Sequence, residues 1–441
     1  MNKLFRISPL LAGILLGMLP VSVIQAATFG TYDPRSLAMG GTGVSQANID
    51  HAAYYNPALL SVAQDDDDFS LLLPTIGIRA YDPKDLIEAV EKYQDGKYET
   101  TFNNSVDSYN NAVTPTEKVA AAKAAAASSK QLVDSLINMS DKELDFEIHA
   151  GVGVAIPSKG LGFAITGSGR LMGGAVLNVT PEDQLLLNKY VDALNCAALL
   201  ADNPADPCGP VELAKTDPVL NPDGSLKDPK GKLTSNARLQ GIMVLEGGLS
   251  MAHEFESLDN WSIGITPKTT QVTTYDFKID IENADLDKEK GELEYEDSNI
   301  DIGIAKRLTE GWKFGMVVKN AVKKEYKTVL GNTIVLEPTA RAGISHHTNW
   351  TTIALDVDLT ENERTGLTKE KTQYAALGME FDLSLIQLRV GARHNMSAED
   401  DREADMLSAG IGLYIFGFHA DLGVAKNDDE LAAALQLGFQ F

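Results

Sequence analysis

The last eleven residues of the chain, 431-LAAALQLGFQF-441, alternate between two kinds of side chain. Every second residue back from the end is apolar: Phe441, Phe439, Leu437, Leu435, Ala433 and Leu431. The residues between them are small or polar. Successive side chains of a β-strand point to opposite faces, so the stretch predicts a strand with one apolar face. No charge occurs in it, which raises the question of what the apolar face contacts.

Alternation of the same kind runs through most of the chain after residue 143. Together with one segment nearer the start, it predicts fourteen strands. Their expected ranges are 69–80, 144–157, 160–171, 238–253, 260–276, 298–308, 311–325, 337–346, 350–361, 371–382, 385–396, 404–416, 417–427 and 430–441.

The connections between these segments alternate in length. Long or charged connections, of which only the last is brief, alternate with short turns. Single-chain barrels of the bacterial outer membrane have an even number of strands, long outside loops and short periplasmic turns. The sequence therefore predicts an all-β fold, a 14-stranded antiparallel transmembrane barrel in the outer membrane of a Gram-negative cell. Both termini would be periplasmic, and the apolar faces would contact outer-membrane lipid and lipopolysaccharide. The ring must close, because an open edge in lipid leaves backbone groups unpaired.

Composition limits the other classes of protein. The 441 residues include 62 acidic and 38 basic side chains, a net charge of -24, which argues against direct contact with nucleic acid. Mean hydropathy is -0.11. No run of eighteen apolar residues follows the first thirty residues, which excludes transmembrane helices downstream.

The start of the chain has the layout of a secretory signal peptide, expected over residues 1–26 with cleavage after Ala26. Lys3 and Arg6 precede the apolar run LLAGILLGMLPVSVI, and small residues follow it. A membrane anchor helix is the alternative, although two prolines and the shortness of the run argue against it. No cysteine follows the run, which argues against a lipoprotein.

Two polar insertions interrupt the strands. Residues 81–143 contain strong helix formers and predict an insertion with two or more helices. Residues 172–236 form a second insertion, a loop that contains Cys196 and Cys208. In an exported protein an even pair of cysteines favours a disulfide, and two cysteines alone make a poor metal site.

The segment 36-SLAMGGTGVSQANIDHAAYYNPALL-60 resembles the N-terminal plug of the FadL-like transporters of hydrophobic compounds. The matching residues are Ala38, Met39, Gly40, Gly41 and Gly43, followed by Asn56, Pro57 and Ala58. Those families also have fourteen strands. Within the group, the long helical first loop and the terminal Phe are similar to the TraF-like proteins, named for plasmid transfer operons.

The resemblance implies a plug over residues 27–68 inside the barrel, which would occupy 69–441, and uptake of fatty-acid-like molecules. It also implies that the barrel-assembly machinery reads Phe441. A phosphate-binding loop is the competing interpretation of GGTG, but no Lys-Ser/Thr follows and no strand precedes it. Glycines instead permit tight turns in a narrow lumen, and the amide of Asn56 can bond to backbone groups.

The strand faces opposite the apolar ones carry charges of both signs. Candidates for the lumen are Arg341, Asp356, Asp358, Glu380, Arg389, Arg393 and Asp421. Their structural interpretation is a ladder of salt bridges that ties the plug to the wall. Their functional interpretation is a polar channel or a site for a ligand headgroup. Because Arg can bind a carboxylate through two parallel hydrogen bonds, Arg389 and Arg393 are the first candidates for a fatty-acid headgroup.

The sequence shows no arrangement of residues typical of an enzyme. Seven histidines are scattered, no nucleophile motif occurs, and no catalytic, metal or cofactor site is expected. The acidic loop DLDKEKGELEYEDS predicts a solvated surface, with divalent cations as the alternative.

Two functions remain as hypotheses. The first is passive transport of hydrophobic molecules, which predicts an apolar pocket beside the plug, next to Asn56. The second is a cell-envelope interaction protein associated with conjugal transfer, which predicts that residues 81–143 contact a protein partner.

Overall fold

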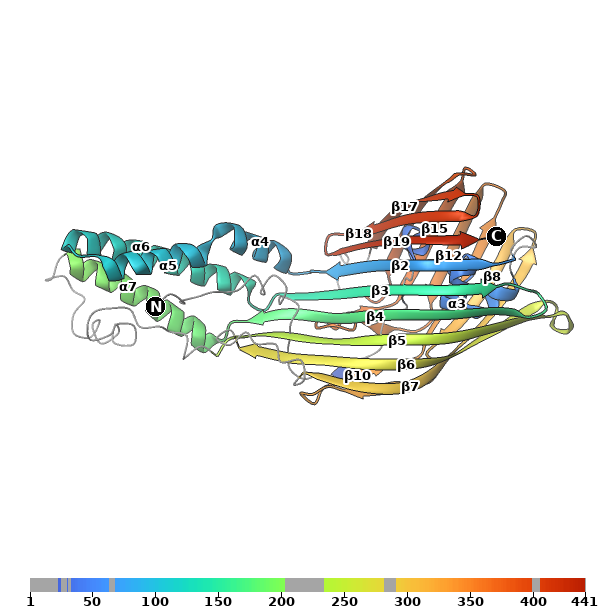
Figure 1. The fold of residues 1–441 in the computed structure, drawn as a ribbon, viewed down its shortest axis with the longest axis horizontal. Coiled ribbons are helices and arrows are strands. Elements are labelled where there is room, and N and C mark those ends of the chain that lie inside the picture. The colour runs from blue at the N-terminus through green and yellow to red at the C-terminus, as the bar shows by residue number, and fades with distance from the viewer. Residues whose placement is uncertain are drawn as a thin grey trace.

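A closed β-barrel forms the main body of the computed structural model, which describes residues 23–24, 30, 33–62, 68–202, 234–280, 291–398 and 405–440 (Figure 1). All neighbouring strands are antiparallel, and the last strand pairs with the first to close the ring. The fourteen barrel strands are β2 (Ser70–Tyr81), β3 (Glu143–Ile156), β4 (Gly162–Asn178), β5 (Asn236–Phe255), β6 (Trp261–Asp280), β7 (Glu292–Thr309), β8 (Trp312–Lys319), β11 (Thr339–His347), β12 (Thr351–Asp358), β15 (Tyr374–Asp382), β16 (Ile386–Asn395), β17 (Asp405–Ile415), β18 (Phe418–Lys426) and β19 (Glu430–Gln440). Each corresponds to one predicted strand, so the predicted fold class is confirmed.

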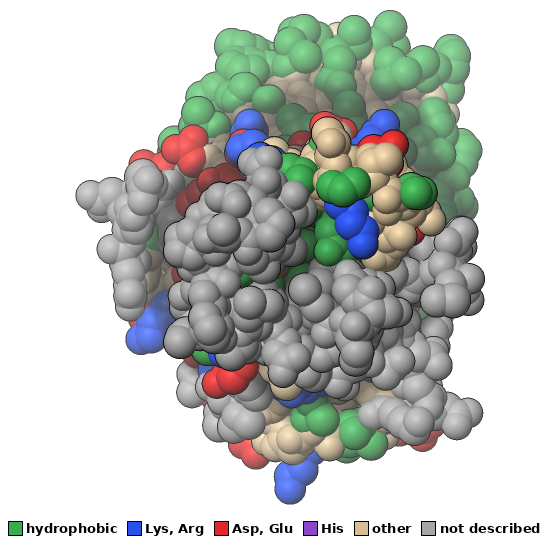
Figure 2. All heavy atoms as spheres, turned by 90° about the vertical axis from the view of Figure 1, so that its left-hand side faces the viewer, with side chains coloured by type: hydrophobic (Ala, Val, Ile, Leu, Met, Phe, Trp, Pro, Cys, Tyr) green, Lys and Arg blue, Asp and Glu red, His purple; other side chains and the backbone are tan. Residues whose placement is uncertain are grey.

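The outer surface of the barrel is apolar. In β19, Leu431 and Leu435 are 57% and 54% exposed, whereas the intervening Ala434 is 4% exposed. Large exposed side chains recur on the other strands, such as Ile165 on β4 and Leu377 on β15. Seen from the helical end, hydrophobic side chains cover much of the outer wall in view (Figure 2). The uncharged face of the closing strand is therefore part of a belt suited to contact with lipid.

Four helices project from the end of the barrel that has the long connections (Figure 1). They are α4 (Leu86–Gly96), α5 (Tyr98–Asn111), α6 (Pro115–Met139) and α7 (Pro181–Asp202). Helix α6 begins with a capping box in which Thr114 and Glu117 bond to each other's backbone N–H groups. Phe102, Leu132 and Leu194 are buried together where α5, α6 and α7 meet. Among the residues described, no helix is both long and apolar enough to cross a bilayer.

The second insertion differs from its predicted form in two ways. Strand β4 continues to Asn178, so residues 172–178 belong to the wall and not to a loop. The glycines there weaken the strand signal, yet a side chain at Gly174 would meet the Asp145 carboxylate at 2.2 Å. Residues 181–202 form helix α7, which has Pro at its start and acidic residues in its first turn. Cys196 lies buried in α7, and Cys208 lies outside the described residues, so the disulfide stays a prediction.

Two short hairpins turn into the barrel at the same end. The first joins β9 (Lys324–Lys327) to β10 (Thr333–Leu336), beside the two-residue β1 (Val23–Ile24). The second joins β13 (Asn362–Glu363) to β14 (Lys371–Thr372). The predicted strand 311–325 was therefore too long: the chain leaves the wall after Lys319, where Asn320 has a left-handed φ of 51°.

Candidate functional site in the barrel lumen

The N-terminal plug occupies the end of the barrel that has the short turns. It contains α2 (Pro34–Ala38), α3 (Ile49–Tyr55) and the 3-10 helix η1 (Pro57–Ser61), and nearly all of its residues are buried. The backbone N–H of Ser158, in the turn after β3, donates to the carbonyl of Leu60 at 3.0 Å. This contact fixes the plug at the level of the short turns.

Glycines of the wall let the plug backbone touch the strands directly. A Cβ at Gly315 would lie 2.1 Å from the carbonyl oxygen of Val44, and one at Gly391 would lie 2.2 Å from the amide nitrogen of Gly40. A Cβ at Gly264 would lie 2.3 Å from the amide nitrogen of Ala58. Real Cβ atoms do not approach backbone so closely, so these positions on β8, β16 and β6 accept only glycine while the plug is seated.

Asn56 joins two parts of the plug to each other and the plug to the wall. Its side-chain amide donates to the carbonyls of Val44 and Ile304, at 3.0 Å each, and its Oδ1 accepts from the N–H of Ala58. Its side chain is fully buried, and Gly303 leaves the space that it fills. The motif residues Pro57 and Ala58 continue into η1. Asn56 therefore adjoins packed backbone and not a pocket.

The Gly-rich loop of the plug is held by a charged group on β11 and β12. Arg341 forms an ion pair with Asp358 at 2.6 Å and donates to the carbonyl of Gly41 at 3.0 Å. Asp356 accepts from the backbone N–H groups of Gly43 and Val44, at 2.7 and 3.0 Å. Gly40 and Gly41 have φ values of +74° and +96°, which other residues rarely adopt. Two predicted lumen residues, Arg341 and Asp356, thus contact the predicted plug motif, and Asp358 binds Arg341.

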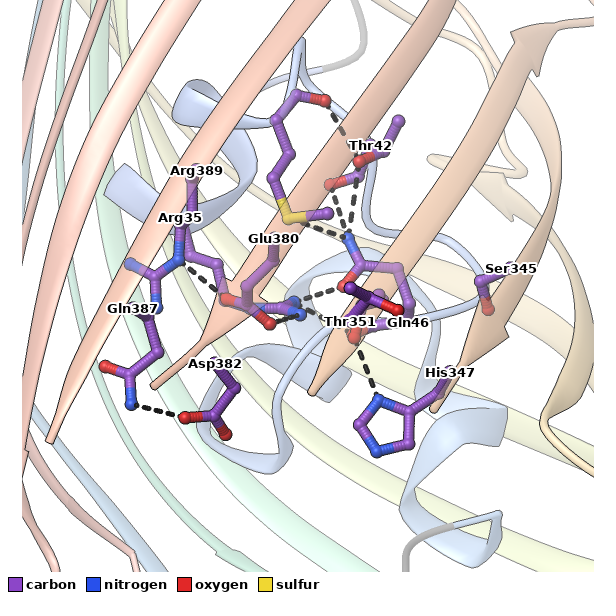
Figure 3. Close-up of polar contacts among 12 residues, drawn as sticks. Arg35, Thr42, Gln46, Ser345, His347, Thr351, Glu380, Asp382, Gln387 and Arg389 are labelled. Atoms are coloured by element: carbon purple, nitrogen blue, oxygen red, sulfur yellow. Dashed lines mark hydrogen bonds and ion pairs between the residues drawn. The ribbon is translucent and has the colours of Figure 1, made fainter. Parts of the chain in front are cut away.

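A second chain of charges connects the plug to β15, β16 and β18 (Figure 3). Arg35 of the plug binds Glu380 through two hydrogen bonds of 2.8 Å. Arg389 also donates to Glu380, at 2.7 Å, and its other end pairs with Asp421. Asp421 accepts in turn from His419. Charges alternate along this chain, so each arginine faces a carboxylate of the protein.

Helix α3 adds Asp50 and His51 to the same region. Asp50 accepts from Gln436 at 2.7 Å and lies 3.4 Å from the His419 ring. Burial by itself would raise the pKa of Asp50, but His51 and His419 beside it lower that pKa below its usual value. Asp50 is therefore charged at neutral pH and attracts both histidines, which adds a polar contact between plug and wall.

At the opposite end of the lumen, three arginines surround one carboxylate. Glu430, at the start of β19, pairs with Arg364 and Arg393 at 2.6 Å each and with Arg79 at 3.1 Å. Its side chain is 2% exposed. Arg364 belongs to the β13–β14 hairpin, whose next residues bond to Asp145 on β3 through the N–H of Leu367. This cluster therefore holds the second hairpin inside the barrel.

The first hairpin is held by Asp276 on β6, which accepts from Thr328 and Asn332 at 2.6 Å each and pairs with Arg238. The apolar side chains of this hairpin cover a patch of the inner wall. We call this surface the inner patch, and its residues are Met172, Ile242, Val244 and Val272, on β4, β5 and β6. The hairpin residues Tyr326, Ile334 and Leu336 lie against it.

A cavity of about 440 Å³ lies beside the plug at the turn end. Its lining combines apolar side chains of the plug, Ala47, Ile49, Leu59 and Val62, with polar and charged ones. The latter include Arg35, Ser45, Gln46, Asn48, Lys313, His347, Thr352, Glu380, Asp382, Gln387, Arg389, Tyr414, His419, Asp421 and Gln440. The transport hypothesis predicted an apolar pocket next to Asn56. That prediction was wrong, because the wall glycines allow the plug to pack without a gap at this motif. Among the described residues, no group of three or more His, Cys, Asp or Glu side chains is arranged for a metal ion.

The structure places the predicted lumen residues in three clusters and adds residues that the sequence analysis missed. Arg341, Asp356 and Asp358 lie at the Gly-rich loop, Glu380, Arg389 and Asp421 lie below the plug, and Arg393 lies with Glu430 at the loop end. Among the missed residues are Glu430, Arg79, Arg364 and Asp145. The parity of β19 could have identified Glu430, because it shares a face with Gln436. No periodic signal could have identified Arg35 in the irregular plug.

Comparison with known proteins gives a family and a fold. A family model described as "F plasmid transfer operon, TraF, protein" matches residues 53–358. No curated protein matches the sequence. The TodX deltaS2S3 mutant, a monoaromatic hydrocarbon channel, is similar in structure with a TM-score of 0.50 and 10% identity, covering 95% of this chain and 99% of that one. The toluene transporter TbuX of Ralstonia pickettii gives 0.49 at 10% identity, covering 94% and 100%, and TodX of Pseudomonas putida gives 0.44 at 10%, covering 95% and 98%. At this level of identity the likeness to the TodX mutant is one of fold.

Proposed function

This chain belongs to the TraF protein family named for the F plasmid transfer operon, and we propose that it binds small hydrophobic molecules and passes them across the outer membrane. In this proposal the short turns and both termini are periplasmic, and the helical bundle lies outside the cell. The molecule to be passed enters at the loop end and leaves through the cavity beside the plug. No catalytic step is involved.

The observation that carries this proposal is the inner patch. Neighbouring inward positions of the same strands are polar, as Gln240, Thr270 and Thr274 are. Ile242 and Val272 are fully buried between them, under the β9–β10 hairpin. The hairpin already shields this apolar surface from water, so in our proposal an apolar ligand binds there by taking the place of Tyr326, Ile334 and Leu336. The fold shared with the TodX mutant, whose name describes a hydrocarbon channel, supports the same class of ligand.

Changing the polarity of the inner patch tests the proposal. The double change Val244→Thr and Val272→Thr keeps the shape of both side chains and adds two hydroxyls to a surface that is dry in the wild type. We expect uptake of radiolabelled toluene by cells that depend on this protein to fall about tenfold, since losing 1–2 kcal/mol of apolar contact corresponds to that factor.

The matched control is Val152→Thr, which places the same change on the 46% exposed outer face. Its uptake should equal that of the wild type. Equal uptake by all three proteins, each assembled to the same level, would argue against transport by way of the inner patch.

The projecting helices favour a second candidate function, contact with another envelope protein. Val113 is 89% exposed and lies in the connection between α5 and α6, two helices that project from the barrel (Figure 1). A photo-crosslinking amino acid at Val113 is expected to capture a protein in intact envelopes. The same group at Ile148, on the outer face of β3, should capture none. Adducts at both positions, or at neither, would count against the bundle as a docking element.

Three further contacts belong to the proposal. The apolar belt would contact outer-membrane lipid, with lipopolysaccharide around the loop end. Phe441, expected to be read by the assembly machinery, lies outside the described residues, as does nearly all of the expected signal peptide. The Cys196–Cys208 disulfide would brace α7 against the segment that follows it.

A further inference from the structure

The arginines of the lumen are each bound to a carboxylate of the protein itself. Arg35 and Arg389 share Glu380, Arg341 binds Asp358, and Arg364 and Arg393 share Glu430. All of these contacts are 2.8 Å or shorter, and the side chains are at most 11% exposed. The donors of these five arginines that would bind a ligand carboxylate are therefore in use. Arg238 also pairs with a carboxylate, Asp276, at 2.9 Å, although among the described residues only one of its three side-chain nitrogens forms a hydrogen bond.

Other cations that point into the lumen also have partners within the protein. Arg170 binds Glu147 at 2.6 Å and Lys268 lies 3.0 Å from Glu246. Lys319 donates to the carbonyl of Tyr54 at 2.7 Å. Lys313 lines the cavity as well, but a lysine lacks the paired donors with which arginine grips a carboxylate.

Two more carboxylates of the lumen are bonded to backbone groups. Asp356 accepts from two backbone N–H groups of the plug, and Asp145 accepts from the N–H of Leu367. A ligand carboxylate can bind Arg35, Arg389 or Arg393 only by displacing a buried carboxylate from it.

We infer that the lumen accepts uncharged hydrophobic molecules and rejects those that carry a carboxylate. This inference rests on the proposed function and names its class of ligand. It also reverses the expectation that Arg389 and Arg393 bind a fatty-acid headgroup, because Glu380, Asp421 and Glu430 occupy the positions that the headgroup would take.

Two probes with the same fluorinated ring test this selection, one with an uncharged methyl group and the other with a carboxylate. Binding of 4-fluorotoluene and of 4-fluorobenzoate to the full protein in nanodiscs is measured by ¹⁹F NMR, with empty nanodiscs as the blank. We expect 4-fluorotoluene to bind at least about tenfold more tightly than 4-fluorobenzoate at neutral pH. Equal binding, or tighter binding of the benzoate, would overturn the inference and leave transport intact. Binding of neither probe would instead refute the proposed function.

The variant Glu380→Gln gives the inference a gain-of-function test. It removes the carboxylate shared by Arg35 and Arg389, so affinity for 4-fluorobenzoate is expected to rise about tenfold, the worth of one charge-assisted hydrogen bond. Glu361→Gln is the matched control, because it removes one negative charge at an exposed pair with Lys371 and frees no arginine of the lumen.

An unchanged affinity in Glu380→Gln would show that Glu380 does not block the arginines. If that variant fails to assemble, Asp421→Asn releases the other end of Arg389 and is read in the same way. Benzoate binding that rises equally in the Glu361→Gln control would mean that net charge alone decides, which also overturns the inference.

Discussion

Replacing Glu430 by alanine is expected to lower the free energy of unfolding by about 3–5 kcal/mol. The carboxylate contacts Arg79, Arg364 and Arg393, and all four side chains are largely shielded from water. Removing this negative charge leaves three buried cations near one another with only Glu370 beside Arg364 and Glu147 beside Arg79, which costs more than the loss of a single pair. The measurement is urea unfolding in detergent micelles, followed by the shift of the folded band in gel electrophoresis.

Two variants define the cause of that loss. Glu430→Gln keeps the shape of the side chain and part of its hydrogen bonding. The free energy of unfolding should therefore fall less in this variant than in the alanine variant. Glu88→Ala removes an exposed carboxylate paired with Lys92 and is expected to leave unfolding unchanged. A Glu430→Ala protein as stable as the wild type would show that Glu370 and Glu147, which already pair with Arg364 and Arg79, are enough to neutralise the cluster.

The second large effect is expected at the glycines beneath the plug. Val fits a β-strand well, so Gly391→Val should not harm the strand itself. Its Cβ would, however, lie 2.2–2.7 Å from backbone atoms of Met39 and Gly40. Backbone cannot yield as a flexible side chain can, so the expected result is a barrel that assembles with its plug displaced.

The displaced plug should become sensitive to protease in detergent, and single-channel conductance should change from near zero to a stable open level. Gly247→Val is the matched control, because the nearest atom to its added Cβ is the Thr269 hydroxyl at 3.5 Å. A protected, non-conducting plug in Gly391→Val would mean that the wall around β16 can move outward enough to admit the side chain.

The strands of the barrel wall could be predicted from sequence because the alternation of their side chains depends only on neighbouring residues in the chain. Lipid outside and water or plug inside impose a period of two, and β19 shows that rule most clearly, with Leu431, Leu435 and Leu437 outward. The same alternation placed Arg341, Asp358, Glu380 and Arg389 on the inward face, where the structure pairs Arg341 with Asp358 and Glu380 with Arg389. Register follows once both strands have a buried face and an exposed face.

The contents of the barrel could not be predicted in the same way. The hairpins at 324–336 and 362–372 are short, and each is held by an aspartate far away in sequence, Asp276 or Asp145. Arg35 has no periodic neighbours that would point it at Glu380. The prediction of an apolar pocket beside Asn56 was wrong for a related reason. Whether a motif faces a cavity or packed backbone depends on glycines such as Gly303, which are far away in sequence.

The seam between β19 and β2 has a consequence for biogenesis. The plug precedes β2 directly in the chain, and its backbone touches wall glycines on strands from β6 to β18. Because the first and last strands join, the ring is complete only when the final residues have been synthesised. A seat this tight cannot be entered by threading the plug through a finished cylinder. We expect the strands to assemble around the plug instead. The width of the plug then sets the circumference of the ring at which β19 pairs with β2.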